Sequence, residues 1–361
     1  MKNRLVSAQP QLALAAAAIV VVVAITAALV AFSPAAGVEP IGPQVETTAA
    51  PASPPAEPVS AVPKPFAATA GGILGQDGVT VTIERPRPEP VLPAVAYGPL
   101  PMQVLDVYRP AVPAVGTIVY FHSGGWGGND RTKIASMILD QLDRGWAVVS
   151  VEYRLIHSAW APEIVADADR SLRFVKANAA ELGIPLAPIV AAGGSAGGHL
   201  AAVLAAAPGM HTDPQLPAEL VAVTPTVDGL IDLVGPSDLN TLWQANELVS
   251  VAQEGLLRCT LDESRISWRL PRCDKQTVDA FSPLALARQA TKLPPAFLSY
   301  GEADTVVPVD TQGIPLYEAW SIAAGEQATW LDVPAATGHN LETMSHAALA
   351  AWLDQVALIR E

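Results

Sequence analysis

Short, continuous apolar runs recur from about residue 100 onward, separated by segments whose apolar positions have helical spacing. The runs cover residues 117–121, 148–151, 189–192, 230–234, 296–300 and 328–333, and helical patterns cover 163–180 and 344–360. Strands that are apolar on both faces are typical of a parallel sheet covered by helices on both sides. The pattern therefore predicts an α/β fold with a mostly parallel central sheet and helices on both faces.

A separate apolar segment near the N-terminus predicts a membrane helix. Residues 12–32 carry no charged side chain and follow Lys2 and Arg4. As a helix they would span about 30 Å, the thickness of a bilayer core. We expect a transmembrane anchor, with residues 1–11 as a cytoplasmic tail and the rest of the chain outside the cytoplasm. The alternative is a signal segment that is cleaved near residues 33–36, which would make the protein secreted.

The next segment, residues 33–70, has the composition of a linker. Between residues 34 and 65 there are nine prolines among 32 residues, with alanine, threonine and glutamate between them. Such a chain cannot bury a core and, in the polyproline conformation, extends by roughly 3 Å per residue. It is either a stalk or a spacer without a defined role. Residues 71–361 are long enough for one large domain.

Composition narrows the kind of partner. The formal net charge is −14 and the isoelectric point is about 4.8. Nucleic-acid binding normally relies on basic patches, so it is not expected. The histidines and cysteines form no His-Glu-x-x-His or Cys-x-x-Cys motif. We therefore expect neither a metal nor an organic cofactor.

The segment 208–281 contains both cysteines and a group of basic residues. The two cysteines of the chain, Cys259 and Cys273, lie within it. Outside the cytoplasm we expect them to form a disulfide, with two buried free thiols as the alternative. The same segment carries the basic residues Arg258, Arg265, Arg269, Arg272 and Lys275. They either favour anionic substrates or belong to a solvated helix face that nearby acidic residues balance.

The glycine-rich turn Gly193-Gly194-Ser195-Ala196-Gly197-Gly198 follows an apolar run directly. In a Gly-x-Ser-x-Gly turn the chain passes sharply from a strand into a helix and holds the serine hydroxyl out for attack. A phosphate-binding turn is the alternative. The spacing does not fit it, because Ser195 occupies the third position of a dinucleotide fingerprint and no Gly-Lys-Ser/Thr follows. Ser195 is thus the candidate nucleophile.

Two further loops supply the partners that a serine nucleophile needs. Asp304 follows the run 296–300, and His339 lies in a small-residue loop before the last helix. We expect His339 to act as general base and Asp304 to orient it. Glu302 and Asp310 are rival carboxylates, less favoured because of their positions in the loop.

The glycine-dense segment 122–128 follows the run 117–121. The candidate oxyanion hole consists of the backbone N–H groups of Gly124, Gly125 and Ala196, the residue after the nucleophile. In serine hydrolases each such donor stabilises the negative oxygen of the tetrahedral intermediate by roughly 3 kcal/mol. His122 and His199 are expected to be structural: His122 holds this loop by hydrogen bonding and His199 packs on a helix. Trp126 either lines the substrate pocket or belongs to the core.

From about residue 98 to its end, the chain resembles the α/β-hydrolase superfamily, near the hormone-sensitive-lipase-like and feruloyl-esterase-like carboxylesterases. The resemblance rests on four segments in order: residues 104–110, His122 to Trp126, Gly193 to Leu200, and 301–304 together with Gly338-His339. It departs from the usual His-Gly-Gly-Gly-Trp at Ser123, but the two later glycines, which tend to supply the oxyanion N–H groups in the family, are present. We therefore expect a working oxyanion hole with a slightly stiffer entry, unless Ser123 cannot adopt the required backbone angles. The resemblance also implies a small cap insertion within residues 208–281.

The resemblance implies a serine hydrolase that cleaves small-molecule or lipid esters through an acyl-enzyme, with short to medium acyl chains. Two alternatives remain open. One is a peptidase or amidase on the same fold. The other is a surface protein that keeps the fold but acts only by binding.

Overall fold

The computed structural model describes residues 87–261 and 270–358. These belong to one compact unit, Ile83–Glu361. The predicted membrane segment, the linker and residues 71–86 lie outside the described residues, as do Arg265 and Arg269. Within the described ranges, none of the helices combines the length and the hydropathy that crossing a membrane would require.

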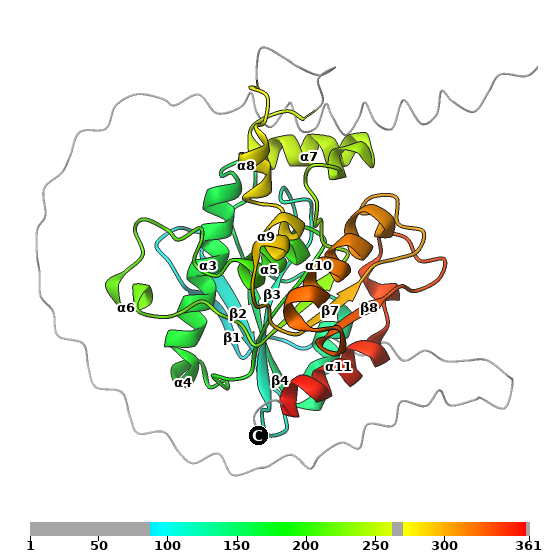
Figure 1. The fold of residues 1–361 in the computed structure, drawn as a ribbon. Coiled ribbons are helices and arrows are strands. Elements are labelled where there is room, and N and C mark those ends of the chain that lie inside the picture. Colours follow the sequence, from blue (N-terminus) through cyan, green and yellow to red (C-terminus); the bar gives the residue numbers. More distant parts are fainter. Residues whose placement is uncertain (1–86, 262–269, 359–361) are drawn as a thin grey trace, which may run out of the picture. The chain divides into compact units, whose positions relative to one another are not determined.

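The centre of the unit is one sheet of eight strands in the order β1-β2-β4-β3-β5-β6-β7-β8 (Figure 1). Its strands are β1 (Leu92–Ala96), β2 (Val104–Tyr108), β3 (Gly116–Phe121), β4 (Trp146–Val151), β5 (Ile189–Gly194), β6 (Gly229–Leu233), β7 (Ala296–Ser299) and β8 (Thr329–Asp332). β2 pairs antiparallel with both β1 and β4, and every other pairing is parallel. The six apolar runs are therefore confirmed as the six strands from β3 to β8, and the mostly parallel sheet is confirmed with them.

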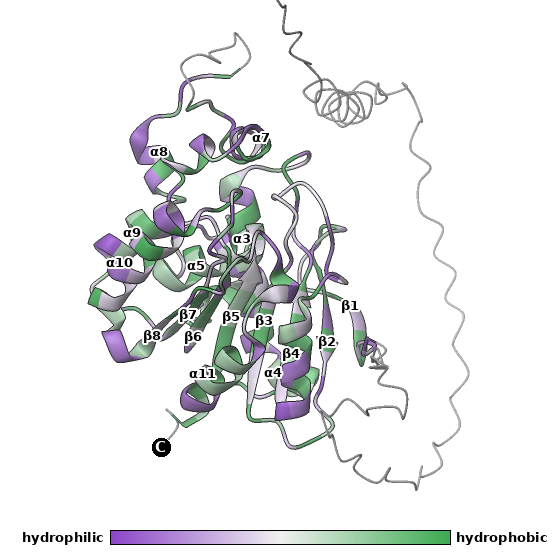
Figure 2. Cartoon of the chain, turned by 90° about the vertical axis from the view of Figure 1, so that its right-hand side faces the viewer, coloured by the Kyte–Doolittle hydropathy of each residue, from purple (hydrophilic) through white to green (hydrophobic). Residues whose placement is uncertain are grey.

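The central strands are apolar on both faces because helices cover both sides. Every residue of β3, β4 and β5 is buried, and Figure 2 shows β3 and β5 in the hydrophobic colours. Two clusters of buried side chains lie on the two faces. One includes residues of α3 (Ala161–Ala177), α5 (Ala196–Ala206), α9 (Pro283–Gln289) and α10 (Ile314–Ala324); the other includes residues of α2 (Ser136–Leu139) and α11 (His346–Leu358).

Helix α5 lies at the middle of this arrangement and has almost no polar side. Ten of its eleven residues are buried, from Ala196 to Ala205. A helix that is apolar all round is buried all round. Here α5 packs on β5 and β6 on one side and on α3 and α9 on the other. The helix that begins at Ser195 is thus fixed from every direction.

The remaining short elements lie in the connections. They are η1 (Asp140–Arg144), α4 (Ala179–Leu182), α6 (Ala218–Val221), η2 (Leu242–Gln244), α7 (Glu247–Leu257), α8 (Lys275–Asp279), η4 (Val309–Gly313), η5 (Glu326–Ala328) and η6 (Leu341–Thr343). Of these, α7 and α8 lie above the carboxyl ends of the strands (Figure 1).

The expected insertion 208–281 is not one continuous cap. Strand β6 interrupts it, and residues 208–228 pack beside α3, where the Arg173 guanidinium donates to the carbonyl oxygen of Val223 over 2.5 Å. The cap proper follows β6 and contains α7 and α8. Cys259 and Cys273 form a disulfide at its outer end, as expected.

Candidate active site

The nucleophile turn places Ser195 between β5 and α5 in a backbone conformation that L-residues rarely adopt. Its φ is 52° and its ψ is −118°. The Ser195 N–H donates to the carbonyl oxygen of Leu233 at the end of β6, 2.8 Å away. Strained backbone persists only where the surrounding structure holds it. Here the neighbouring strand and the buried helix do so.

Glycines allow this turn to pack against two strands at once. A Cβ on Gly197 would lie 1.9 Å from the carbonyl oxygen of Phe121 at the end of β3. A Cβ on Gly198 would lie 2.3 Å from Oδ1 of Asp232 at the end of β6. No side chain fits at either position, so glycine is required by close approach and not by the turn alone.

Asp304, His339 and Ser195 form one hydrogen-bonded series. His339 Nδ1 lies 2.7 Å from Asp304 Oδ2, and His339 Nε2 lies 2.9 Å from Ser195 Oγ. Asp304 is 4% exposed, and its Oδ1 accepts the N–H groups of Val306 and Val307. These two N–H groups fix the carboxylate, which leaves Oδ2 for the imidazole.

The rival carboxylates lie elsewhere. Glu302 is exposed, and its Oε2 accepts the N–H of Ala336 over 2.9 Å. Asp310 is exposed at the start of η4. The Ala303 N–H also donates to the carbonyl oxygen of Thr337 over 2.8 Å. Glu302 therefore helps to join the carboxylate loop to the histidine loop, a structural contact that the sequence did not reveal.

The backbone of residues 123–125 is oriented by bonds to its carbonyl groups. The Ser123 carbonyl accepts His122 Nδ1–H over 2.8 Å, and the Gly124 carbonyl accepts the N–H groups of Gly127 and Gly128 over 3.1 and 3.0 Å. In a trans peptide the N–H points opposite to the carbonyl, so the Gly124 and Gly125 N–H groups are turned away from these donors.

Those two glycines line the same pocket as Ser195. Within the described residues, the N–H groups of Gly124, Gly125 and Ala196 donate to no protein acceptor. Ala196 is also the first residue of α5, where the helix dipole favours negative charge. The three candidate donors are thus available to an oxyanion.

His122 is a buried structural residue, as expected. Its ring stacks on Tyr153 with centroids 4.2 Å apart, and the Tyr153 hydroxyl donates to the His122 carbonyl oxygen over 2.7 Å. Further out, Arg131 anchors the end of the loop: its Nε donates to Asp106 and its N–H to Glu152, over 2.8 and 3.0 Å. This ion cluster could not be recognised from the sequence, because its three members come from three separate segments.

Ser123 does not distort the loop. Within residues 123–125, the positive φ angles fall at Gly124 and Gly125, 124° and 59°, whereas Ser123 is not among the described residues with positive φ. Its Oγ accepts Asn129 Nδ2–H over 3.2 Å at the edge of the pocket. The departure from three consecutive glycines therefore falls where glycine is not needed.

Trp126 belongs to the core, and it is not among the described residues that line the Ser195 pocket. Trp126 is 2% exposed and packs edge-on against His199, with centroids 5.2 Å apart. His199 accepts from the indole at Nδ1 and donates from Nε2 to the Phe281 carbonyl oxygen. Burial lowers the pKa of His199 from 6.5 to about 4, so the ring is neutral and structural, as expected. The Trp126 indole thus belongs to the packing beneath the loop.

The pocket at Ser195 has a volume of about 350 Å³. Its other lining residues are Ser123, Gly124, Gly125, Asn129, Leu248, Val249, Ala252, Val306, His339 and Leu341. Three of these come from α7, which sequence reasoning did not connect with the site. None of the described lining residues is Lys, Arg, Asp or Glu.

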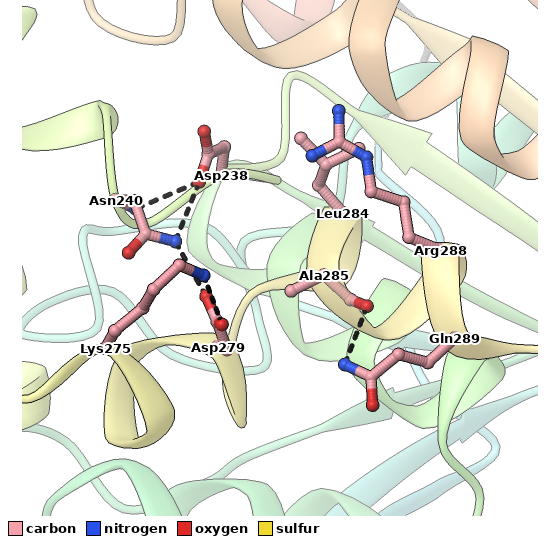
Figure 3. Close-up of a pocket in the computed structure, with 8 residues that line it drawn as sticks. All are labelled: Asp238, Asn240, Lys275, Asp279, Leu284, Ala285, Arg288 and Gln289. Carbon is pink, nitrogen blue, oxygen red and sulfur yellow. Dashed lines mark hydrogen bonds and ion pairs between the residues drawn. The ribbon is translucent and has the colours of Figure 1, made fainter.

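A second hollow, shown in Figure 3, lies beside α8 and α9 and shares no residue with the first. In it Asn240 Nδ2 bridges Asp238 and Asp279, and Lys275 pairs with Asp279. Lys275, one of the basic residues for which two roles were left open, thus pairs with Asp279 outside the Ser195 pocket. Arg258 and Arg272 are exposed and do not line that pocket. The described residues therefore favour a solvated, charge-balanced surface.

The sheet order, the turn at Ser195 and the histidine-carboxylate pair define an α/β-hydrolase. The BD-FAE family model matches residues 105–319, more than half of the chain. The chain therefore belongs to the BD-FAE family, in the carboxylesterase branch of the α/β-hydrolases.

Relatives and solved structures agree with this assignment. Esterase LipC of Mycobacterium tuberculosis is 28% identical over 313 residues, which cover 79% of this chain and 73% of LipC. Carboxylesterase NlhH of the same species is 31% identical over 252 residues, covering 63% of this chain and 72% of NlhH. A truncated carbohydrate esterase from gut microbiota has a TM-score of 0.61 at 22% identity, covering 74% of this chain and 95% of that one. Apo Thermogutta terrifontis esterase 2 has a TM-score of 0.55 at 25% identity, covering 76% and 95%.

Proposed function

We propose that the protein hydrolyses carboxylic esters through an acyl-enzyme on Ser195. The observation that carries this proposal is the continuous series Asp304–His339–Ser195, with contacts of 2.7 and 2.9 Å, at a pocket where two backbone N–H groups of the glycine loop remain available. The names of LipC and NlhH, an esterase and a carboxylesterase, support the same reaction class.

In the first step His339 Nε2 accepts the Ser195 proton as Oγ attacks the ester carbonyl carbon. The negative oxygen that forms accepts from the N–H groups of Gly124, Gly125 and Ala196. His339 then gives the proton to the leaving alkoxide, and the acyl group stays on Oγ. Water, deprotonated by His339, attacks the acyl carbon, and the bond to Oγ breaks as His339 returns the proton to Ser195, which releases the acid. Asp304 holds the imidazole in the tautomer with its proton on Nδ1.

The substrate is an uncharged ester of a small molecule or lipid, with a short to medium acyl chain. No Lys, Arg, Asp or Glu is among the described residues that line the pocket, which supports this. A charged group placed there would lose hydration without gaining a partner.

We further propose that residues 12–32 anchor the protein in a membrane, with the catalytic domain outside the cytoplasm. The support is the uncharged apolar run and the preceding Lys2 and Arg4. Membrane fractionation, followed by protease treatment of intact cells, tests it. Release of a shortened protein into the medium would instead establish a cleaved signal segment.

The test of the esterase is hydrolysis of p-nitrophenyl acetate and butyrate by the detergent-solubilised chain and by Ser195→Ala. Ser158→Ala, at an exposed serine, is the matched control. We expect turnover and fluorophosphonate labelling in the wild type and in Ser158→Ala, and neither in Ser195→Ala. Amide turnover near the ester rate would favour an amidase. A folded protein that neither turns over ester nor labels would favour a binding role.

A further inference from the structure

Helix α7 forms one wall of the Ser195 pocket, and Ser123 and Asn129 form a polar part of its lining. The helix contributes Leu248, Val249 and Ala252. Leu248 is 73% exposed, which places it at the mouth, whereas Val249 and Ala252 are half-buried. The pocket thus has a polar edge and an apolar wall, and the wall comes from a cap element outside the central sheet.

The N-terminus of α7 is attached to the carboxylate loop. Asn246 caps the helix, since its Oδ1 accepts the Val249 N–H over 3.0 Å. The Asn246 Nδ2 donates to the carbonyl oxygen of Thr305 over 3.1 Å, one residue beyond Asp304. The side chain that starts the helix therefore also sets its distance from the catalytic carboxylate.

The C-terminal half of α7 is attached to the glycine loop through Ile156. A Cβ on Gly255 would lie 2.9 Å from Ile156 Cδ1, and a Cβ on Gly127 would lie 3.3 Å from the same atom. Ile156 is thus enclosed between a glycine of α7 and a glycine of the loop. Just after α7, the Cys259–Cys273 disulfide fixes the end of the segment. The wall is therefore held at both ends.

The proton transfers of the proposed reaction indicate which part of the ester, alcohol or acyl, lies beside this wall. His339 protonates the leaving oxygen, so the alcohol part of an ester lies on the side of the histidine and its neighbour Leu341. The acyl part lies on the other side, along the glycine loop. There the side chain of Ala252 lies beside Gly125: its Cβ is 3.9 Å from the position that a Cβ on Gly125 would take.

We propose that Ala252 and Val249 of α7 determine the size of the acyl group that the site accepts. This inference rests on the proposed function. The small side chain at residue 252 leaves room beside the oxyanion donors, and Val249, one turn earlier on the same face, closes that room. The class of substrate is an ester with an uncharged, unbranched aliphatic acyl group whose length these two side chains limit.

The test compares kcat/KM for p-nitrophenyl acetate and p-nitrophenyl hexanoate in the full chain. We expect Ala252→Leu to lower the hexanoate-to-acetate ratio at least tenfold, and Val249→Ala to raise it at least threefold. Val251→Leu is the matched control, because Val251 is on the same helix, 54% exposed and outside the pocket. We expect its ratio to stay within twofold of the wild type.

Two outcomes would overturn the proposal: unchanged ratios in both pocket variants, or an equal shift in Val251→Leu. If Ala252→Leu fails to fold, Val249→Ala decides alone, because it only removes atoms. Failure of the esterase itself is distinct, since the wild type would then hydrolyse both esters no faster than Ser195→Ala.

Discussion

Tyr300 and Asp232 meet beneath the nucleophile turn, with Tyr300 Oη 2.7 Å from Asp232 Oδ2. The same Oη lies 2.7 Å from the carbonyl oxygen of Gly235. A phenol carries one proton, so it cannot donate fully to both of these oxygens. When Asp232 is ionised, the Tyr300 hydroxyl shares its proton between the two oxygens; when Asp232 is protonated, it can donate to Tyr300 and leave the Tyr300 proton to Gly235. Burial raises the pKa of Asp232 from 3.8 to about 6, although the hydrogen bonds from Tyr300 and Gly235 act in the opposite direction.

The raised pKa of Asp232 predicts a pH dependence of stability. Between about pH 4 and 6 the folded protein keeps a proton that the unfolded chain has released. This group therefore lowers the free energy of unfolding as pH rises through that window. Asp232→Asn supplies the donor permanently. Relative to the wild type, we expect the variant to become more stable by about 3 kcal/mol between pH 4 and pH 7.

Urea unfolding of both proteins at several pH values measures this difference. Comparing the two proteins cancels the opposite contribution of His199, whose lowered pKa reduces stability as pH falls below its unfolded value of 6.5. A difference that stays constant with pH would contradict the raised pKa of Asp232.

Asp304→Asn should abolish most of the activity without unfolding the protein. The Val306 and Val307 N–H groups hold the side-chain oxygen, so the amide nitrogen would face His339 Nδ1. The imidazole would then carry its proton on Nε2, toward Ser195, and could not act as a base. We expect a loss of roughly 10⁴-fold in kcat.

Glu302→Gln is the control for that variant. Its amide oxygen still accepts the Ala336 N–H, and Glu302 does not touch His339. We expect kcat within about threefold of the wild type. Similar losses in the two variants, measured with p-nitrophenyl butyrate, would mean that the carboxylate role is wrongly assigned.

Ser123→Gly restores the residue usual in related esterases and should change little. Ser123 has an ordinary φ and makes one side-chain hydrogen bond, to Asn129. We expect kcat/KM for p-nitrophenyl butyrate to change by less than about threefold. A gain of tenfold or more would show that the serine obstructs the oxyanion hole, and a comparable loss would show that its hydroxyl assists.

Gly198→Ala should destabilise the fold, because the new methyl group would lie 2.3 Å from Asp232 Oδ1 and 3.0 Å from the Gly235 Cα. We expect a cost of about 1–3 kcal/mol, read as a lower Tm. Gly128→Ala is the matched control, since its nearest neighbour would be 3.7 Å away and its φ is not positive. Equal Tm values for the two variants would refute the packing argument.

The sequence predicted the sheet and the proximity of the candidate catalytic side chains, for a physical reason. Strands buried on both faces are continuous apolar runs, and a strained serine between strand and helix needs a recognisable set of small neighbours. The order of Ser195, Asp304 and His339 then followed from position alone. The structure brings these three together.

The wall that α7 forms in the Ser195 pocket could not be predicted in the same way. Leu248, Val249 and Ala252 lie on a short helix whose own pattern does not say which neighbours it meets. The position of Trp126 was equally undetermined, because a tryptophan in a glycine loop suits a pocket and a core alike. Contacts between segments distant in sequence decided both, including the enclosure of Ile156 by Gly127 and Gly255.

Strand β8 is only four residues long and lies at the margin of the sheet, paired with β7 alone. His339 lies in the loop that follows β8, seven residues after Asp332, whereas Ser195 lies at the end of β5 in the interior of the sheet. Marginal strands detach at a lower free energy than central ones. Fraying of this one edge would remove the proton acceptor while most of the fold persists. Turnover is therefore a gauge of local integrity, and it should disappear under mild denaturation before the global unfolding transition begins.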